Sequence, residues 1–205
     1  MKGFFKKILG IKDKDLDPKE DIESIPIENF SNKEVDIPLD EQFADNFTNT
    51  GGKFIYCANQ QEVLHAINDI LLENDWDEIL SFDDDINSLL QRTGTPYSDR
   101  TDSNSAFFTT CEALIAHDGS ILISSNQLKG RKLPNLPYDF IILSKIEYII
   151  ENRSDGLGSL ISRYGKNIPS GITTVKGPKT VTGANNILDS GSINTSKNIY
   201  LLLVE

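Results

Sequence analysis

Apolar and polar positions follow one another in blocks along this chain, and two neighbouring apolar blocks give the clearest pattern. Ala113 to Ala116 and Ile121 to Ser124 lie on either side of the pair Asp118-Gly119. Asp-Gly tolerates the positive φ of a tight turn, so we expect two antiparallel strands joined as a hairpin. Their apolar character is nearly continuous rather than alternating, which predicts a hairpin buried on both faces inside a layered α/β domain.

From Pro38 onward, short apolar runs alternate with stretches of helical spacing. The runs predict strands at residues 53–57, 76–82, 139–143, 172–175 and 199–204. The 3.6-residue spacing predicts helices at residues 39–47, 60–72, 86–90, 146–151 and 157–164, the last two separated by a break near Asp155-Gly156. This order of strands and helices favours an α/β fold with a parallel-rich sheet flanked by helices and an inserted β-hairpin.

The first 37 residues have a different pattern. Residues 2–12 place Phe4, Phe5, Ile8 and Leu9 on one side of a helix and lysines largely on another, which predicts a short basic amphipathic helix. An acidic, polar linker with two prolines follows. We therefore divide the chain into residues 1–37, a helix and linker, and residues 38–205, the α/β domain. The helix fits a tail that docks loosely on its own domain better than a membrane or partner contact, because one short helix binds lipid weakly.

Composition narrows the classes of partner. The 205 residues include 31 acidic and 20 basic side chains, a net charge of −11 that repels nucleic-acid backbones. Cys57 and Cys111 are far apart and His65 stands alone within a helix, so we expect no metal site and no bound cofactor. No apolar run reaches the length of a membrane span, and we expect a cytoplasmic protein without membrane attachment.

Four segments taken in order resemble a known family. They are ALIAHDGSILISS, LPYDFIILSK, TTVKGPKT and NIYLLLVE, and together they resemble the LUD-domain family of lactate-utilisation protein C. The residues shared with that family are Ala113, Ala116, Gly119, Leu133, Pro134, Gly177 and Pro178. The resemblance implies a core like that of the NagB/RpiA/CoA-transferase superfamily. It also implies a role beside iron–sulfur partner subunits in oxidising L-lactate.

The chain departs from the family at polar positions. His117-Asp118 stands where the family has Glu-Thr before the hairpin glycine, and residues 182–185 replace an Ala-Asp-Ile-Glu segment. Asn194 corresponds to a histidine in the turn before the last strand. The chain thereby lacks a carboxylate, able to act as a base or a nucleophile, at two places where the family carries one.

The candidate ligand site comprises three segments. Residues 171–186 are rich in glycine and small hydroxyl residues, which let backbone N–H groups approach an anion, and Lys176, Lys179 and Thr180 lie within them. His117 lies in the hairpin turn, and Arg100 lies in the polar loop 94–105 that leads into the hairpin. Because ligands gather beyond the carboxyl ends of parallel strands, we expect these residues to bind a small carboxylate or phosphate together. The alternative is a plain glycine-rich surface loop.

These observations favour an accessory component of L-lactate or related small-carboxylate utilisation, acting with iron–sulfur partner proteins. Whether the chain catalyses a reaction alone stays open at this point. One alternative is an isomerase or transferase that acts on a phosphorylated sugar or a thioester, which rests on fold analogy. The other is a non-catalytic interaction module that docks through the Phe4/Phe5 helix.

Overall fold

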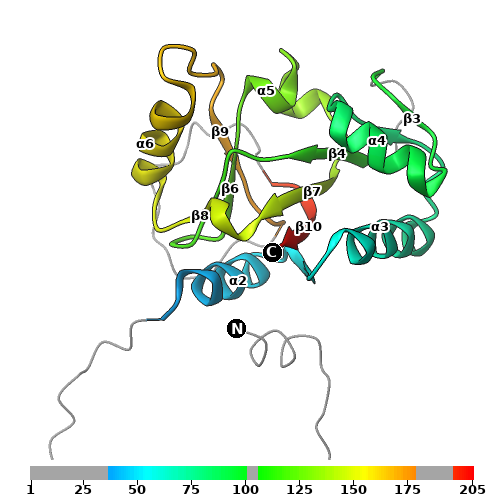
Figure 1. Ribbon diagram of the computed structural model, residues 1–205, viewed down its shortest axis with the longest axis horizontal. Helices are drawn as coiled ribbons and strands as arrows, with labels where there is room; N and C mark the ends of the chain where they lie inside the picture. Colours follow the sequence, from blue (N-terminus) through cyan, green and yellow to red (C-terminus); the bar gives the residue numbers. More distant parts are fainter. Residues whose placement is uncertain (1–36, 101–105, 179–195) are drawn as a thin grey trace, which may run out of the picture. The chain divides into compact units, whose positions relative to one another are not determined.

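We describe a computed structural model of the chain over residues 37–100, 106–178 and 196–205 (Figure 1). Residues Leu39–Glu205 form one compact unit. The amphipathic helix and linker predicted for residues 1–37 lie outside the described residues except for Ile37, so that assignment stays a prediction. No helix in the described ranges is long and apolar enough to cross a membrane.

A six-stranded sheet with only parallel pairings forms the centre of the domain. Its strand order is β1-β10-β7-β4-β2-β3, where the strands are β1 (Lys53–Cys57), β2 (Ile79–Leu80), β3 (Tyr97–Ser98), β4 (Ala106–Thr110), β7 (Asp139–Lys145) and β10 (Asn198–Val204). β10 pairs along its length with β7 and also with β1, and it is buried from Ile199 to Leu203. The predicted parallel-rich α/β fold is therefore confirmed.

Successive residues of the central strands serve opposite faces of this sheet. In β10, Tyr200 and Leu202 pack with α3 (Gln60–Asn74) and α4 (Asp84–Thr93). Leu201 and Leu203 belong to the other core, which contains Phe43 and Phe47 of α2 (Leu39–Asn49). This alternation follows from the two-residue period of a strand. A continuously apolar strand is therefore buried between two layers.

The hairpin belongs to a second sheet rather than to the central one. Its four strands have the order β8-β5-β6-β9, where the strands are β5 (Ala113–Ile115), β6 (Ser120–Ile123), β8 (Ile149–Ile150) and β9 (Thr173–Val175). Leu114 and Ile121 face the core shared with the six-stranded sheet, whereas Ala113 and Leu122 pack against Leu160 of α6 (Arg153–Tyr164). The predicted antiparallel pairing and burial on both faces are confirmed.

Several elements differ from the sequence-based expectation. The sequence analysis predicts no strand between the polar loop 94–105 and the hairpin, yet β4 is a buried strand of the central sheet that pairs with β2 and β7. Residues 146–151 form a 3-10 turn (Ile146–Tyr148) and β8 instead of a helix. α6 continues through Gly156 without a break, because Asn152 caps its start and Gly156 packs against Ile150 and Leu122. The predicted strand at residues 76–82 shortens to β2.

Candidate functional site

A pocket of about 490 Å³ lies at the carboxyl ends of the central strands. Thr110 and Cys111 reach it from the end of β4, Lys145 from the end of β7 and Val204 from the end of β10. Ligand sites of open α/β sheets occupy this edge, where the loops after the strands form a crevice. We therefore take this pocket as the candidate functional site.

Glu112 is the buried acid of this pocket, with only 1% of its surface exposed. It follows Cys111 directly and precedes β5, at the point where the chain passes from the central sheet to the second sheet. One carboxylate oxygen, Oε1, accepts hydrogen bonds from Ser124 Oγ at 2.7 Å and Asn126 Nδ2 at 3.2 Å. The other, Oε2, accepts from Tyr164 Oη at 3.1 Å and Arg163 Nη1 at 3.3 Å. Four donors thus surround this carboxylate.

Arg163 is the cation that this carboxylate holds. Its Nη1 also donates to the backbone carbonyl of Glu112 at 3.3 Å, and the guanidinium lies 4.5 Å above the ring of Tyr148. Its other guanidinium nitrogens make no hydrogen bond to any described residue, and 32% of the side chain is exposed. The free edge of a fixed guanidinium matches the two oxygens of a carboxylate.

The hydrogen bonds decide what Glu112 does chemically. A carboxylate offers about four lone-pair sites, and Glu112 has a donor for each of them. The arrangement therefore fits a carboxylate that orients Arg163 rather than a nucleophile or base. Lys145, also in the lining, adds a second cation, and its 3.4 Å pair with Glu147 is exposed and weak.

The cysteines provide no thiolate at neutral pH. Burial raises the pKa of Cys111, which lines the pocket, to about 12, although its Sγ donates to Ser144 Oγ at 3.2 Å. Burial likewise raises the pKa of Cys57 to about 11.

Among the described residues, no group of three or more His, Cys, Asp or Glu side chains is placed to hold a metal ion.

Two of the five predicted site residues meet at the hairpin turn. Lys176 Nζ lies 2.8 Å from Asp118 Oδ2, and Asp118 follows the exposed His117. Burial favours the neutral form of Asp118, but hydrogen bonds from Lys176 and Ser120 outweigh it, so the pKa of Asp118 is lowered. The ammonium of Lys176 therefore already has an anionic partner.

The other three predicted residues do not join this pair within the described structure. Arg100 follows the edge strand β3, and Figure 1 shows β3 and β8 at opposite sides of the domain. Lys179 and Thr180 lie outside the described residues. The turn is also at the opposite end of β5 from Glu112, and neither His117, Lys176 nor Arg100 lines the pocket. Anion binding by these five residues stays a prediction.

Sequence reasoning did not single out Glu112, Arg163 or Tyr164. One signal was present, because Glu112 interrupts the apolar run between Cys111 and Ala113, where an acid requires buried partners. The partners themselves are 51 and 52 residues further along the chain, and only the packing of α6 brings them to it.

The comparisons with known proteins bear on the fold. No protein-family model matches the chain, and no curated protein matches its sequence. In three dimensions the chain is similar to the crystal structure of a DUF162 family protein from Deinococcus radiodurans, with a TM-score of 0.59 and 17% sequence identity. The match covers 82% of this chain and 96% of that protein. DUF162 is the LUD-domain family, so the chain shares its fold with a member of the family that its sequence resembles.

Proposed function

We propose that this chain is a LUD-type component of small-carboxylate utilisation that binds a 2-hydroxy acid such as L-lactate in the pocket at Glu112 and Arg163. The observation that carries the proposal is the free edge of the Arg163 guanidinium, which Glu112 holds in the lining of the pocket. Guanidinium and carboxylate pair through two parallel hydrogen bonds, a geometry that Lys cannot reproduce.

Two further features support a carboxylate ligand at this place. The Tyr148 ring below Arg163 keeps the guanidinium plane in one orientation, which lowers the cost of ordering it when a ligand binds. Ser144 and Thr110 also line the pocket and supply hydroxyl groups within the same cavity. A 2-hydroxy acid needs a cation for its carboxylate and a hydroxyl partner for its alcohol, and this lining offers both.

The likeness in fold to a DUF162 family protein supports a LUD-type fold, and the resemblance of the four sequence segments to the LUD-domain family is what suggests lactate utilisation and an iron–sulfur partner. Under this proposal the chain supplies carboxylate binding, and the partner supplies the electron acceptor that oxidation of a 2-hydroxy acid requires. The chain's two buried, separated cysteines are consistent with a partner that holds the cluster.

Calorimetric titration with L-lactate tests the binding step. Wild type binds, and Arg163→Lys weakens binding about tenfold because the charge stays while the paired hydrogen bonds are lost. Arg153→Lys, the same change in the first turn of α6, is the matched control and leaves the affinity unchanged. Lys176→Ala tests the predicted site at the hairpin turn. Loss of binding in Lys176→Ala but not in Arg163→Lys would move the ligand to the turn.

A growth assay tests whether the chain is needed for the use of L-lactate. A strain that lacks the chain should grow on glucose but not on L-lactate, and the wild-type gene should restore growth where an Arg163→Gln gene does not. Normal growth of the deletion strain on L-lactate would contradict the proposed pathway, and calorimetry would then still report on the binding site alone.

A further inference from the structure

The pocket is larger than a three-carbon acid requires. Its volume of about 490 Å³ falls within the range of about 300–1,000 Å³ that holds ligands of drug size. A ligand as small as L-lactate would leave much of this space to water. The size therefore leaves room for a longer acid, of which the carboxylate at Arg163 would be one end.

The lining shows in which direction such a molecule extends. Arg163 and Tyr164 come from the last turn of α6, whereas Asp85 and Leu89 come from α4, and all four line the same pocket. Figure 1 shows α6 and α4 at opposite sides of the carboxyl ends of the central strands. The pocket therefore spans from one helix to the other, over an apolar stretch formed by Val63, Leu143 and Val204.

The α4 end of the pocket carries two carboxylates, those of Asp83 and Asp85. The first amides of α4, those of Asp85 and Ile86, already donate to Asp83 Oδ1 at 2.9 and 3.2 Å. At the start of α3, Gln61 N and Glu62 N likewise donate to Asn59 Oδ1, and Gln60 adds a side-chain amide to the lining. A phosphate would find these donors occupied and two aspartates in the lining, Asp83 and Asp85. An ammonium or hydroxyl group would find acceptors.

We propose that the pocket also takes carboxylic acids longer than L-lactate, whose far end carries hydrogen-bond donors, an ammonium or hydroxyl groups, held by Asp85 at the start of α4. The assignment of the carboxylate end to Arg163 rests on the proposed function. The assignment of hydrogen-bond donors to the far end rests on the separate observations at α4. Asp83 contributes charge there while its Oδ1 caps the helix, and Asp85 has its side chain available to the ligand.

A series of model acids tests the proposal by calorimetry. The probes are hexanoate, 6-aminohexanoate, gluconate and 6-phosphogluconate, which share a carboxylate and differ in the groups that the rest of the molecule carries. 6-Aminohexanoate or gluconate should bind at least about tenfold more tightly than hexanoate, because a hydrogen bond to a charged carboxylate is stronger than one between neutral groups. 6-Phosphogluconate should bind more weakly than gluconate.

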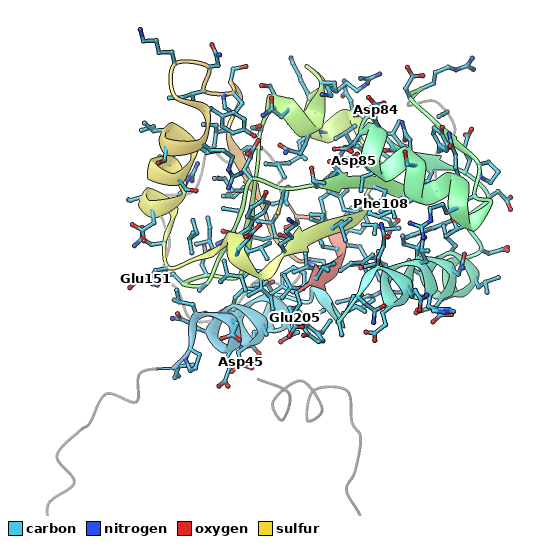
Figure 2. The ribbon with its side chains drawn as sticks, in the orientation of Figure 1. Asp45, Asp84, Asp85, Phe108, Glu151 and Glu205 are labelled. Carbon is cyan, nitrogen blue, oxygen red and sulfur yellow. The ribbon has the colours of Figure 1, made fainter. Side chains whose placement is uncertain are left out.

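Neighbouring aspartates supply a matched pair of variants. Figure 2 shows Asp84 and Asp85 on the first turn of α4, and only Asp85 lines the pocket. Asp85→Asn should remove most of the preference for 6-aminohexanoate over hexanoate, whereas Asp84→Asn, with the same change in charge, should keep it.

Equal binding of hexanoate and both donor-bearing acids would overturn this inference and leave the carboxylate site standing. An equal effect of Asp84→Asn and Asp85→Asn would overturn it as well, because the loss would then reflect net charge. Absence of binding by every acid, or binding that Arg163→Lys leaves unchanged, would contradict the proposed function itself.

Discussion

Glu112 Oε2 lies 3.3 Å from Arg163 Nη1, although the two residues are 51 positions apart in the chain. The acid is almost fully buried and the side chain of the arginine is about one-third exposed. This pair joins the start of β5 to the last turn of α6 beside the pocket. It therefore contributes both to the packing of α6 on the second sheet and to the orientation of the guanidinium.

The first prediction concerns stability. Glu112→Ala should lower the free energy of unfolding by about 3 kcal/mol, because it removes a buried acid and leaves its donors without an acceptor. Urea unfolding monitored by circular dichroism measures the change. Glu151→Ala is the control, since this acid is exposed, and it should stay within about 0.5 kcal/mol of wild type. Equal stability of the two variants would show that the four hydrogen bonds contribute nothing.

The second prediction separates backbone strain from close packing at glycines. Gly119 has a φ of +64°, and a Cβ there would lie 2.4 Å from Phe47 N and 2.5 Å from Asn46 C. Gly94 has a φ of +73° with nothing within 4 Å of that position. Gly94→Ala should therefore cost about 1 kcal/mol for the left-handed conformation alone. Gly119→Ala should cost about 3 kcal/mol, because α2 must also shift.

Thermal and urea unfolding of both glycine variants measure the difference. Equal costs would mean that the contact between the hairpin turn and the end of α2 is loose. A second readout is the near-ultraviolet circular dichroism of Gly119→Ala, which should change because the backbone of Phe47 lies against Gly119 and its ring is buried in the core.

The hairpin and the last strand could be predicted from sequence because residues that are close together in the chain specify each of them. Asp118-Gly119 between apolar runs specifies a turn, and β10 is a run of apolar residues long enough to be a central strand. β4 was missed because its five residues follow a polar loop and precede another apolar run. The two-residue strands β2, β3 and β8 are defined by their pairing partners, which no local pattern contains.

The site was harder to predict for a physical reason. Sequence patterns identify cations in glycine-rich segments, which led to Lys176, and that ammonium pairs with Asp118. Glu112 and Arg163 come together only because α6 packs on the sheet that contains the hairpin. Contacts of this kind depend on tertiary structure, so a charged residue within an apolar run was the one local sign of them.

The third prediction uses the lowered pKa of Asp118. A carboxyl group whose pKa is lower in the folded state contributes stability above its unfolded pKa, near 3.9, and loses it as the pH falls through the folded value. Asp118→Asn should therefore be less stable than wild type at pH 7. The difference should be below about 1 kcal/mol, because both side chains are more than one-third exposed.

Urea unfolding of wild type and Asp118→Asn is measured at a series of pH values from 7 to 2. The difference between wild type and Asp118→Asn should shrink below about pH 4 and vanish at the acid end. A difference that stays constant over the series would mean that the ion pair with Lys176 does not contribute to folding.

The fourth prediction concerns the thiols. Burial raises the pKa of Cys111 to about 12 and that of Cys57 to about 11, so both stay protonated at pH 8. A disulfide reagent such as dithionitrobenzoate should react with the native protein much more slowly than with the urea-unfolded chain, where both thiols are accessible. Reaction of either native cysteine at the rate of a free thiol would contradict the buried positions.

The most direct measurement for the account as a whole is a crystal structure of the protein grown with saturating L-lactate. We predict that the lactate carboxylate lies in the pocket at the carboxyl ends of β4 and β7, with its oxygens about 2.7–2.9 Å from the free guanidinium nitrogens of Arg163. Glu112 should keep its four hydrogen bonds. Lactate bound against Lys176 at the hairpin turn, with the pocket at Arg163 empty, would contradict the account.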